Sequence, residues 1–593
     1  AFIAMTKSEK SAFSHSLTVG QLLVRGRLDS CSVVGATFGR PLECNENRSN
    51  VLDVLGGKHM SKNTFLKGAF ILGISGILVK IVGAFFRIPL ANIIGSEGVG
   101  YYQVAYPIYT FLLSFSAAGF PTAISKLVSE KRARGNIRGG HKVFQVSLGI
   151  LAIIGIVSFL FLSLGAKFLV NNFIKSPSSY FSMLALAPAL LFIPIMAAYR
   201  GYFQGLQNMV PTAVSQVTEQ IARVIVGLAL ATFLLSHGTE YAAAGASFGA
   251  TAGAIAGLTI IFLIYVNNKN SIVSEFQPIE QYRVESVERI TKDLLRIAIP
   301  ITVGAAVLPL INMIDTMIVL RRLQEAIGFS YEEANSLFGQ LTGMAITLVQ
   351  LPPVLTTALA MSIVPVIAAS KVRDDTVSIE KDVKSAFRVT LLIGLPSFVG
   401  LAVLSTPIMA MLFPKEPPSA GRVLLYLSFA TLSLALVQTL TGILQGIGKP
   451  EIPVRNLLIG ALTKLVVTYI LTGIPFLNIK GAAIGTVMAY AVAAALDLVA
   501  VKRNTGVKFG FVQFVLKPVV SVSIMGGAVY LIYRFMFPIT GNTVSTILSI
   551  VAGGVIYGLM LFITGTILEE DFLILPGGNK LVGFLRRFNL MKQ

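Results

Sequence analysis

The sequence is poor in charge, with 13% Asp, Glu, Lys and Arg against 54% hydrophobic residues over 593 positions. Soluble globular domains carry about 25% charged residues, so this composition excludes a soluble fold. The apolar runs are about 20 to 30 residues long. Membrane helices need about 20 such residues, whereas strands of a membrane barrel would be about ten residues long with alternating polarity. We therefore predict an all-α polytopic membrane protein.

Cysteine and histidine are also scarce. Both cysteines, Cys31 and Cys44, lie in the polar N-terminal segment, and the four histidines lie outside the predicted spans without regular spacing. The membrane part therefore has no residues for a disulfide framework or a metal cluster. We expect no metal and no cofactor, and we expect a transporter rather than an enzyme.

Negative charge is in deficit, because 48 Lys and Arg residues stand against 28 Asp and Glu, a formal net charge of +20. In a soluble protein this excess would suggest nucleic acid. In a membrane protein basic residues collect in the cytoplasmic loops, where they face anionic lipid. We therefore expect membrane lipids as partners and no nucleic acid.

Residues 1–59 differ from the rest, because they are polar and lack the apolar core of a signal peptide. Met60 opens a short basic lead into the first apolar run. We expect residues 1–59 to be a disordered, non-native extension, either upstream translated sequence or a cloning remnant. A genuine regulatory arm is the alternative.

The hydropathy pattern predicts fourteen spans. Pro352 and Pro353 fall inside the eighth, which is too long for one straight helix, so we expect a break there. The spans are predicted near residues 68–94, 104–127, 143–170, 181–199, 210–235, 242–266, 294–320, 338–369, 386–413, 423–447, 454–474, 481–501, 512–537 and 544–568.

Positive charge alternates between the predicted loops. The loops after even-numbered spans are rich in Lys and Arg, beginning with residues 126–142 and Arg200, and the C-terminal tail is basic as well. The alternate loops are short and poor in positive charge. The positive-inside rule then predicts that both termini are cytoplasmic.

Two motifs recur at nearly one offset. Residues 201–206 (GYFQGL) match 442–447 (GILQGI) at an offset of 241, and 245–250 (GASFGA) match 481–486 (GAAIGT) at 236. Each match joins span n to span n+6, so the halves have the same orientation and form two parallel six-helix lobes around a central cavity. The predicted parts are an N-lobe (residues 60–270), an amphipathic cytoplasmic linker (271–292), a C-lobe (293–503), two accessory helices (504–570) and a basic cytoplasmic tail (571–593).

Lys80 and Arg87 stand inside the first apolar run. A cation near the middle of a membrane helix costs about 2.5–3.5 kcal/mol, which favours a protein interior or wet cavity over lipid. Seven residues are close to two helical turns, so both charges share a face about 10 Å apart. Gly76 and Gly83 leave room beside them. The pair would suit an anionic ligand with more than one negative group; an interior ion pair or snorkelling to the interface is the alternative.

Four more charges lie in later spans. Glu219 and Arg223 are four residues apart and can pair on one helix face or form a polar patch in the cavity. Asp315 and Lys464 are the lone charges that we note in spans seven and eleven. We place Asp315 nearer the outer face than Lys464. Protonation of Asp315 could couple transport to a proton gradient, and a static salt bridge is the alternative.

Two further groups have structural interpretations. The Gln-Gly turns containing Gly205 and Gly446 are expected to end helices and to act as hinges, with glycine supplying positive φ and close packing. The tyrosines of 101–109 are expected to form an aromatic belt at the outer interface.

Several stretches resemble the MurJ-like members of the multidrug/oligosaccharidyl-lipid/polysaccharide exporter superfamily, in wording closest to the stage V sporulation protein B branch. The resemblance covers roughly residues 60–570. Its matching stretches are GAFFRIPL at 83–90, AGFPTAISK at 118–126, YRGYFQG at 199–205 and PTA at 211–213.

The resemblance implies export of a lipid-linked sugar precursor, first of all the peptidoglycan precursor lipid II, across the bacterial cytoplasmic membrane, with Lys80 and Arg87 in the diphosphate-binding role. It also implies links to cell-wall synthesis, cell shape and sporulation. Sodium, protons or the membrane potential could drive transport, with the Lys464 ammonium in place of a bound cation near Asp315. Another polyprenyl-linked glycan or a drug or organic-cation antiporter is the alternative. Nothing in the sequence indicates an obligate oligomer, so we expect a monomer.

Overall fold

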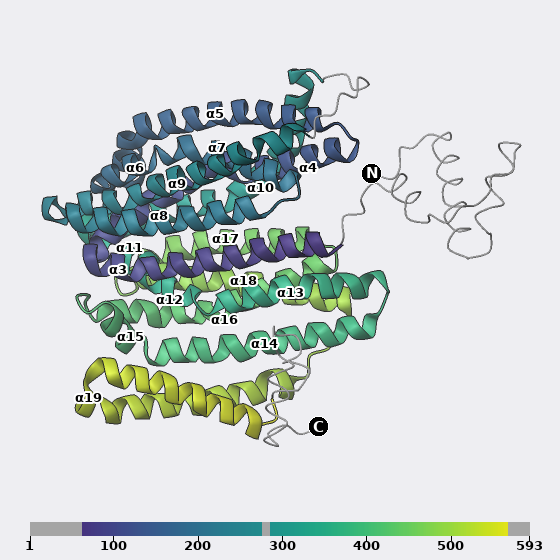
Figure 1. Cartoon of the computed structure of the whole chain (residues 1–593). Coiled ribbons are helices and arrows are strands. Elements are labelled where there is room, and N and C mark those ends of the chain that lie inside the picture. Colours follow the sequence, from purple (N-terminus) through teal and green to yellow (C-terminus); the bar gives the residue numbers. More distant parts are fainter. Residues whose placement is uncertain (1–61, 275–284, 567–593) are drawn as a thin grey trace, which may run out of the picture. The chain divides into compact units, whose positions relative to one another are not determined.

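The computed structural model describes residues 62–274 and 285–566 (Figure 1). The chain divides into two compact units, residues 1–64 and 65–593, and everything below concerns the second. Every regular element in the described residues is a helix, as the apolar runs predict. The predictions for residues 1–59 and 571–593, and for the middle of the 271–292 linker, fall outside the described residues.

The helices follow one another with short connections, and several include π-helical or 3₁₀ turns. The first half holds α3 (Lys62–Ala117), α4 (Gly119–Ala133), α5 (Ile137–Phe168), η1 (Leu169–Ile174), η2 (Pro177–Ser179), α6 (Tyr180–Leu186), α7 (Ala189–Gly205), α8 (Val210–Leu234), η3 (Leu235–His237) and α9 (Thr239–Ser274). The second half holds α10 (Val287–Arg321), η4 (Arg322–Ile327), α11 (Tyr331–Gly339), η5 (Gln340–Ala345), α12 (Ile346–Gln350), α13 (Pro353–Val372), α14 (Thr376–Val403), α15 (Ser405–Leu412), α16 (Ser419–Gly446), α17 (Glu451–Thr472) and α18 (Ile479–Thr505). A final pair follows, η6 (Val512–Leu516) and α19 (Lys517–Ile563).

The prediction of fourteen spans is confirmed. Twelve stretches of the described residues are long and apolar enough to cross a membrane. Two of them hold two spans each, because α3 and α19 are interrupted by a glycine with positive φ, Gly95 (φ 67°) and Gly541 (φ 72°). The halves of α19 lie side by side in Figure 1, and the Lys517 Nζ at its start donates to the Gly565 carbonyl at 3.4 Å.

The break predicted in the eighth span is present. α12 ends at Gln350 and α13 begins at Pro353, because a proline nitrogen has no hydrogen to donate to the preceding turn and its ring clashes there. The pieces before the break are η5 and α12, and both face the interior of the protein. The eighth span therefore consists of the short segments η5 and α12 followed by α13, rather than of one straight helix.

The repeated Gln-Gly motifs make the same packing contact in both halves. Gly205 of α7 lies on α4, where a Cβ atom would come within 2.7 Å of Val128 Cβ. Gly446 of α16 lies on α13, where a Cβ atom would come within 2.9 Å of Ile367 Cβ. Each glycine therefore permits close approach between the fourth and second spans of its lobe.

One part of the glycine prediction is wrong. Gly205 and Gly446 are the last residues of α7 and α16, so the predicted helix ends are confirmed. The predicted positive φ does not fall on these glycines but two residues later in each copy, at Gln207 (62°) and Gly448 (88°). The offset between these two positions is again 241 residues. The motif glycines allow close helix packing, and the residues that follow them form the turn. A hinge role for Gly205 and Gly446 stays a prediction.

The second repeated motif makes an equivalent contact between the fifth and sixth spans. Gly249 of α9 lies on α8, where a Cβ atom would come within 2.6 Å of the Arg223 carbonyl oxygen. Gly485 of α18 lies on α17 against Thr468 and the Lys464 carbonyl. Corresponding glycines thus make corresponding helix contacts, which supports the parallel repeat read from the sequence.

We expect Gly205→Ala and Gly446→Ala each to lower the free energy of unfolding by about 1–3 kcal/mol, because the added methyl group overpacks a helix interface. Gly149→Ala is the matched control, because no atom lies within 4 Å of the position its Cβ would take. Thermal unfolding of the purified protein in one detergent measures the three variants. Equal stability of Gly205→Ala and Gly149→Ala would contradict the packing role.

Candidate functional site

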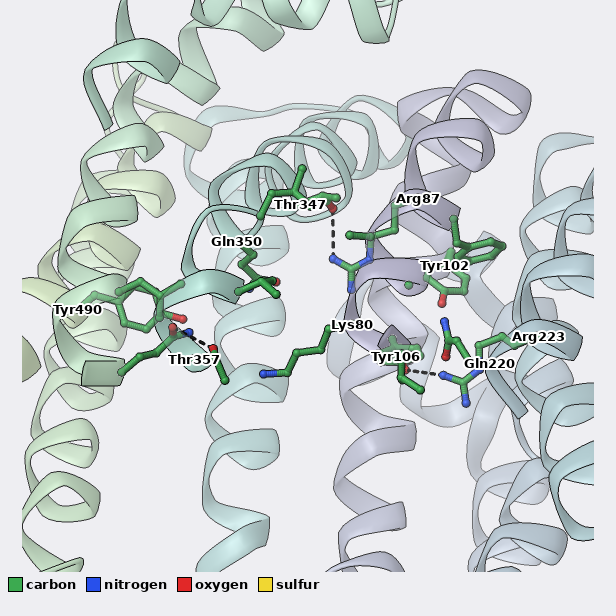
Figure 2. Close-up of a pocket in the computed structure, with 18 residues that line it drawn as sticks. Lys80, Arg87, Tyr102, Tyr106, Gln220, Arg223, Thr347, Gln350, Thr357 and Tyr490 are labelled. Carbon is green, nitrogen blue, oxygen red and sulfur yellow. Dashed lines mark hydrogen bonds between the residues drawn. The ribbon is translucent and has the colours of Figure 1, made fainter. Parts of the chain in front are cut away.

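A cavity of about 410 Å³ lies between the two lobes at the level of Lys80 and Arg87 (Figure 2). Its N-lobe wall comes from α3 and α8, and its C-lobe wall comes from α12, α13, α16 and α18. The volume is within the range of about 300–1,000 Å³ that is usual for small-molecule sites.

The structure places Lys80 and Arg87 in this cavity, on one face of α3. Arg87 Nη1 donates to Thr347 Oγ1 of α12 at 3.2 Å, so it reaches the opposite lobe. Lys80 is exposed to the cavity, and its ammonium forms no ion pair or hydrogen bond with any described residue. The spacing argument therefore located both side chains correctly, while their role toward a ligand stays a prediction.

Glu219 and Arg223 pair on α8 as the four-residue spacing predicts, at 2.8 Å. Glu219 also accepts from Arg200 Nη2 at 2.9 Å. Arg200 was expected in a loop after span four, but it lies within α7, a full turn before the helix ends. One carboxylate thus lies between two guanidinium groups. Glu219 does not line the cavity, whereas Arg223 does, so the cavity receives positive charge from this cluster.

Asp315 of α10 and Lys464 of α17 form a salt bridge of 2.7 Å, with both side chains largely buried. The expected difference in depth is therefore wrong, and the two residues meet. The pair lines a second cavity of about 210 Å³, which shares Arg87 and Tyr106 with the first. Asp315 Oδ1 is buried and has no hydrogen-bond partner among the described residues. A role of the pair in coupling stays a prediction.

The tyrosines of 101–109 do not form an interfacial belt. Tyr101 and Tyr109 are buried within the protein, and Tyr102 and Tyr106 line the cavity. The Tyr106 hydroxyl accepts from Arg223 Nη1 at 3.4 Å. Tyr102 and Tyr106 therefore lie on the cavity face of the second half of α3, where their rings fill space beside the cations.

The lobes meet tightly at the end of the cavity near Gly95. The Ser96 amide donates to Glu416 Oε1 at 2.8 Å, and Gln340 Nε2 donates to Glu416 Oε2 at 3.1 Å. The hydroxyls of Ser96 and Ser336 form a hydrogen bond of 2.7 Å, and Gly339 packs against the Ser96 carbonyl. In the predicted orientation this closed end is the outer one.

Comparison with known proteins agrees with this architecture. Residues 65–371, more than half of the chain, match the family model described as polysaccharide biosynthesis protein. The chain belongs to the polysaccharide biosynthesis protein family. Residues 341–470 match a second model, MatE.

Three similar proteins come from Bacillus subtilis (strain 168). The chain is 30% identical to the uncharacterized membrane protein YabM over 88% of its own length and 96% of the relative. It is 29% identical to stage V sporulation protein B, over 87% and 98%. It is 28% identical to the lipid II flippase MurJ, over 79% and 88%.

Solved structures show the same fold. A lipid II flippase MurJ in an inward closed conformation matches with a TM-score of 0.61 at 19% identity, over 83% of this chain and 98% of that chain. An inward-facing multidrug resistance MATE transporter of the MOP superfamily also matches with 0.61, at 15% identity, over 75% and 98%. This member of the polysaccharide biosynthesis protein family is therefore a multi-pass membrane protein with a transporter fold.

Sequence reasoning missed the neutral part of the site. Gln350, Gln438 and Tyr490 line the cavity from the C-lobe. Each is a neutral polar residue within a predicted span, and no charge or repeated motif marks it in the sequence. Asp497 of α18 was also missed. It is buried and accepts from Asn456 Nδ2 at 2.8 Å, but it does not line either cavity described above.

We expect Asp315→Asn and Lys464→Met each to destabilise the protein by about 3–5 kcal/mol, because either change leaves a buried charge without its partner. The double variant Asp315→Asn/Lys464→Met should recover most of that loss. Thermal unfolding of the four proteins gives the interaction free energy. A double variant whose loss equals the sum of the two single losses would show that the salt bridge contributes nothing.

Proposed function

We propose that this protein is a flippase for a lipid-linked oligosaccharide, with lipid II as the first candidate cargo. The observation that carries the proposal is the charge of the cavity. Lys80, Arg87 and Arg223 line it, and none of the described residues that line it is a carboxylate. Arg223 is paired with Glu219 behind the wall, so the charge offered to a ligand is mainly that of Lys80 and Arg87. Such a site at membrane depth is suited to an anionic cargo.

A diphosphate fits this site better than a single carboxylate would. Arginine binds phosphate oxygens through a planar fork of donors, and lysine contributes a compact point charge. The ammonium of Lys80 has no partner among the described residues, so it is available to a ligand. A polyprenyl diphosphate that bears a sugar carries its negative charge at the junction between lipid and glycan, where these cations would hold it.

Alternating access then follows from the two lobes. The head group would enter from the cytoplasmic side, and the lobes would rock to open the end now closed around Ser96 and Glu416. The lipid tail would stay in the bilayer or along α19. We propose that the protein works as a monomer in the bacterial cytoplasmic membrane with both termini cytoplasmic, driven by a proton or sodium gradient or by the membrane potential.

The alternative cargo within this mechanism is another polyprenyl-linked polysaccharide unit, because such cargoes share the anionic link. An antiporter for drugs or organic cations is the second candidate function, favoured by the fold match to a MATE transporter. A cationic cargo would require acidic or aromatic groups without competing cations, and Lys80 and Arg87 oppose it.

We expect the full chain to restore growth of cells depleted of their lipid II flippase, and Lys80→Ala/Arg87→Ala to lose this rescue at equal membrane abundance. The double change removes the cations proposed to hold the diphosphate. The control is Lys517→Ala/Arg534→Ala, which removes two cations of α19 that do not line the cavity. Growth after depletion, with membrane abundance measured by immunoblot, gives the result.

Rescue by the double cavity variant would rule out the cation pair as the cargo site while leaving the transport function intact. Failure of the unmodified chain to rescue would exclude lipid II as its cargo. Resistance to organic cations in those same cells would then favour the antiporter.

A further inference from the structure

The two walls of the central cavity differ in chemistry. All three of its cations, Lys80, Arg87 and Arg223, stand on the N-lobe wall. The C-lobe wall has no charged residue among those that line this cavity, and its polar groups are amides and hydroxyls, Thr347, Gln350, Thr357, Gln438 and Tyr490. Figure 2 shows the two groups facing each other, with Tyr490 and Thr357 opposite Arg223 and Gln220. A ligand that spans this cavity therefore meets charge on one side and neutral hydrogen-bonding groups on the other.

The side-chain amide of Gln438 in α16 is hydrogen-bonded through its oxygen but not through its nitrogen. The hydroxyls of Thr356 and Thr357 contact its Oε1 at 2.7 and 3.0 Å. Its Nε2 forms no hydrogen bond with a described residue, while the side chain lines the cavity. Two α13 threonines thus fix the orientation of an amide that still has a polar atom for a ligand. Fixed side chains with a spare donor or acceptor are typical of binding sites rather than of structural pairs.

Gln350 and Tyr490 line the same cavity as this amide. Gln350 is exposed to the cavity, and neither its amide nor the Tyr490 hydroxyl forms a hydrogen bond with a described residue. Both residues also line the second cavity, next to the Asp315–Lys464 pair. In the interior of a membrane protein such groups require water or a ligand as partners. They make one wall that is rich in uncommitted neutral donors and acceptors.

We propose that this C-lobe wall, formed by Gln350, Gln438 and Tyr490, is a glycan subsite. Amides donate to and accept from hydroxyl groups, and a tyrosine adds a hydroxyl and an apolar ring face for the C–H side of a sugar ring. A neutral sugar provides both features, whereas an ionised diphosphate offers acceptor oxygens alone and has no apolar face. The inference rests on the proposed flippase function and adds a division of labour: the N-lobe binds the anionic link, and the C-lobe selects the sugar attached to it.

The sequence offers a clean reporter, because the chain contains no tryptophan. Tyr490→Trp keeps an aromatic ring in the subsite and makes its indole the sole such fluorophore in the protein. Titration of the full chain in detergent with undecaprenyl diphosphate, and separately with the same lipid carrying a disaccharide, gives two dissociation constants. We expect the disaccharide-bearing lipid to bind more tightly than the bare one.

Three variants and one control in this background separate the walls. Gln350→Leu and Gln438→Leu should each weaken binding of the disaccharide-bearing lipid about 3- to 10-fold, the effect of losing one neutral hydrogen bond, and leave the bare lipid unchanged. Lys80→Ala should weaken both lipids. Gln513→Leu, the same chemical change outside the cavity, should alter neither. Gln350 makes no hydrogen bond in the described residues, so its loss does not threaten the fold.

The outcomes distinguish the two proposals. If both lipids bind equally, or if the glutamine variants weaken both lipids alike, the glycan subsite is wrong and the flippase proposal stands. If neither lipid binds the parent protein while its fold is intact by circular dichroism, the flippase proposal fails and the subsite fails with it. Loss confined to the disaccharide-bearing lipid supports the subsite.

Discussion

The cost of burying charge inside a membrane protein governs this structure. An isolated charge in an apolar interior is so unfavourable that it must find a partner or reach a wet cavity. Asp315 takes Lys464 as its partner, and Glu219 takes Arg200 and Arg223. Lys80 has no partner among the described residues and faces the cavity. The chemistry of the site is therefore what remains after the other spans have neutralised their own charges.

Close packing through glycine gives this charge pattern its geometry. The fourth span of each lobe approaches the second at a motif glycine, and the sixth approaches the fifth in the same way. Because equivalent residues make equivalent contacts 241 and 236 positions apart, the two lobes repeat one helix arrangement. The cavity lies where these lobes face each other, and the cations that line it come from the N-lobe wall.

Local features of the fold could be predicted from the sequence, and contacts between distant helices could not. Span count, the break at Pro352 and Pro353, and the shared face of Lys80 and Arg87 depend on residues within a few turns of each other. The meeting of Asp315 with Lys464 depends on how deep α10 and α17 sit, which hydropathy leaves uncertain by several residues. Arg200 was misassigned for the same reason, because a charge near a span end can belong to the helix or to the loop. Gln438 gave no signal, since its role arises only when α13 and α16 pack together.

The distribution of ion pairs bears on how the lobes could move. Each buried group of paired charges lies within a single lobe. Asp315 pairs with Lys464 inside the C-lobe, and Glu219 pairs with two arginines inside the N-lobe. The contacts that cross between lobes around the cavity are single hydrogen bonds, such as Arg87 to Thr347 and the Ser96 amide to Glu416. The interlobe ion pair of Lys175 and Glu325 is exposed, and exposed pairs contribute little. A rocking motion of the kind proposed would therefore separate the lobes without leaving any of these buried charges unpaired, and the energetic barrier to opening would lie in the neutral contacts at the closed end.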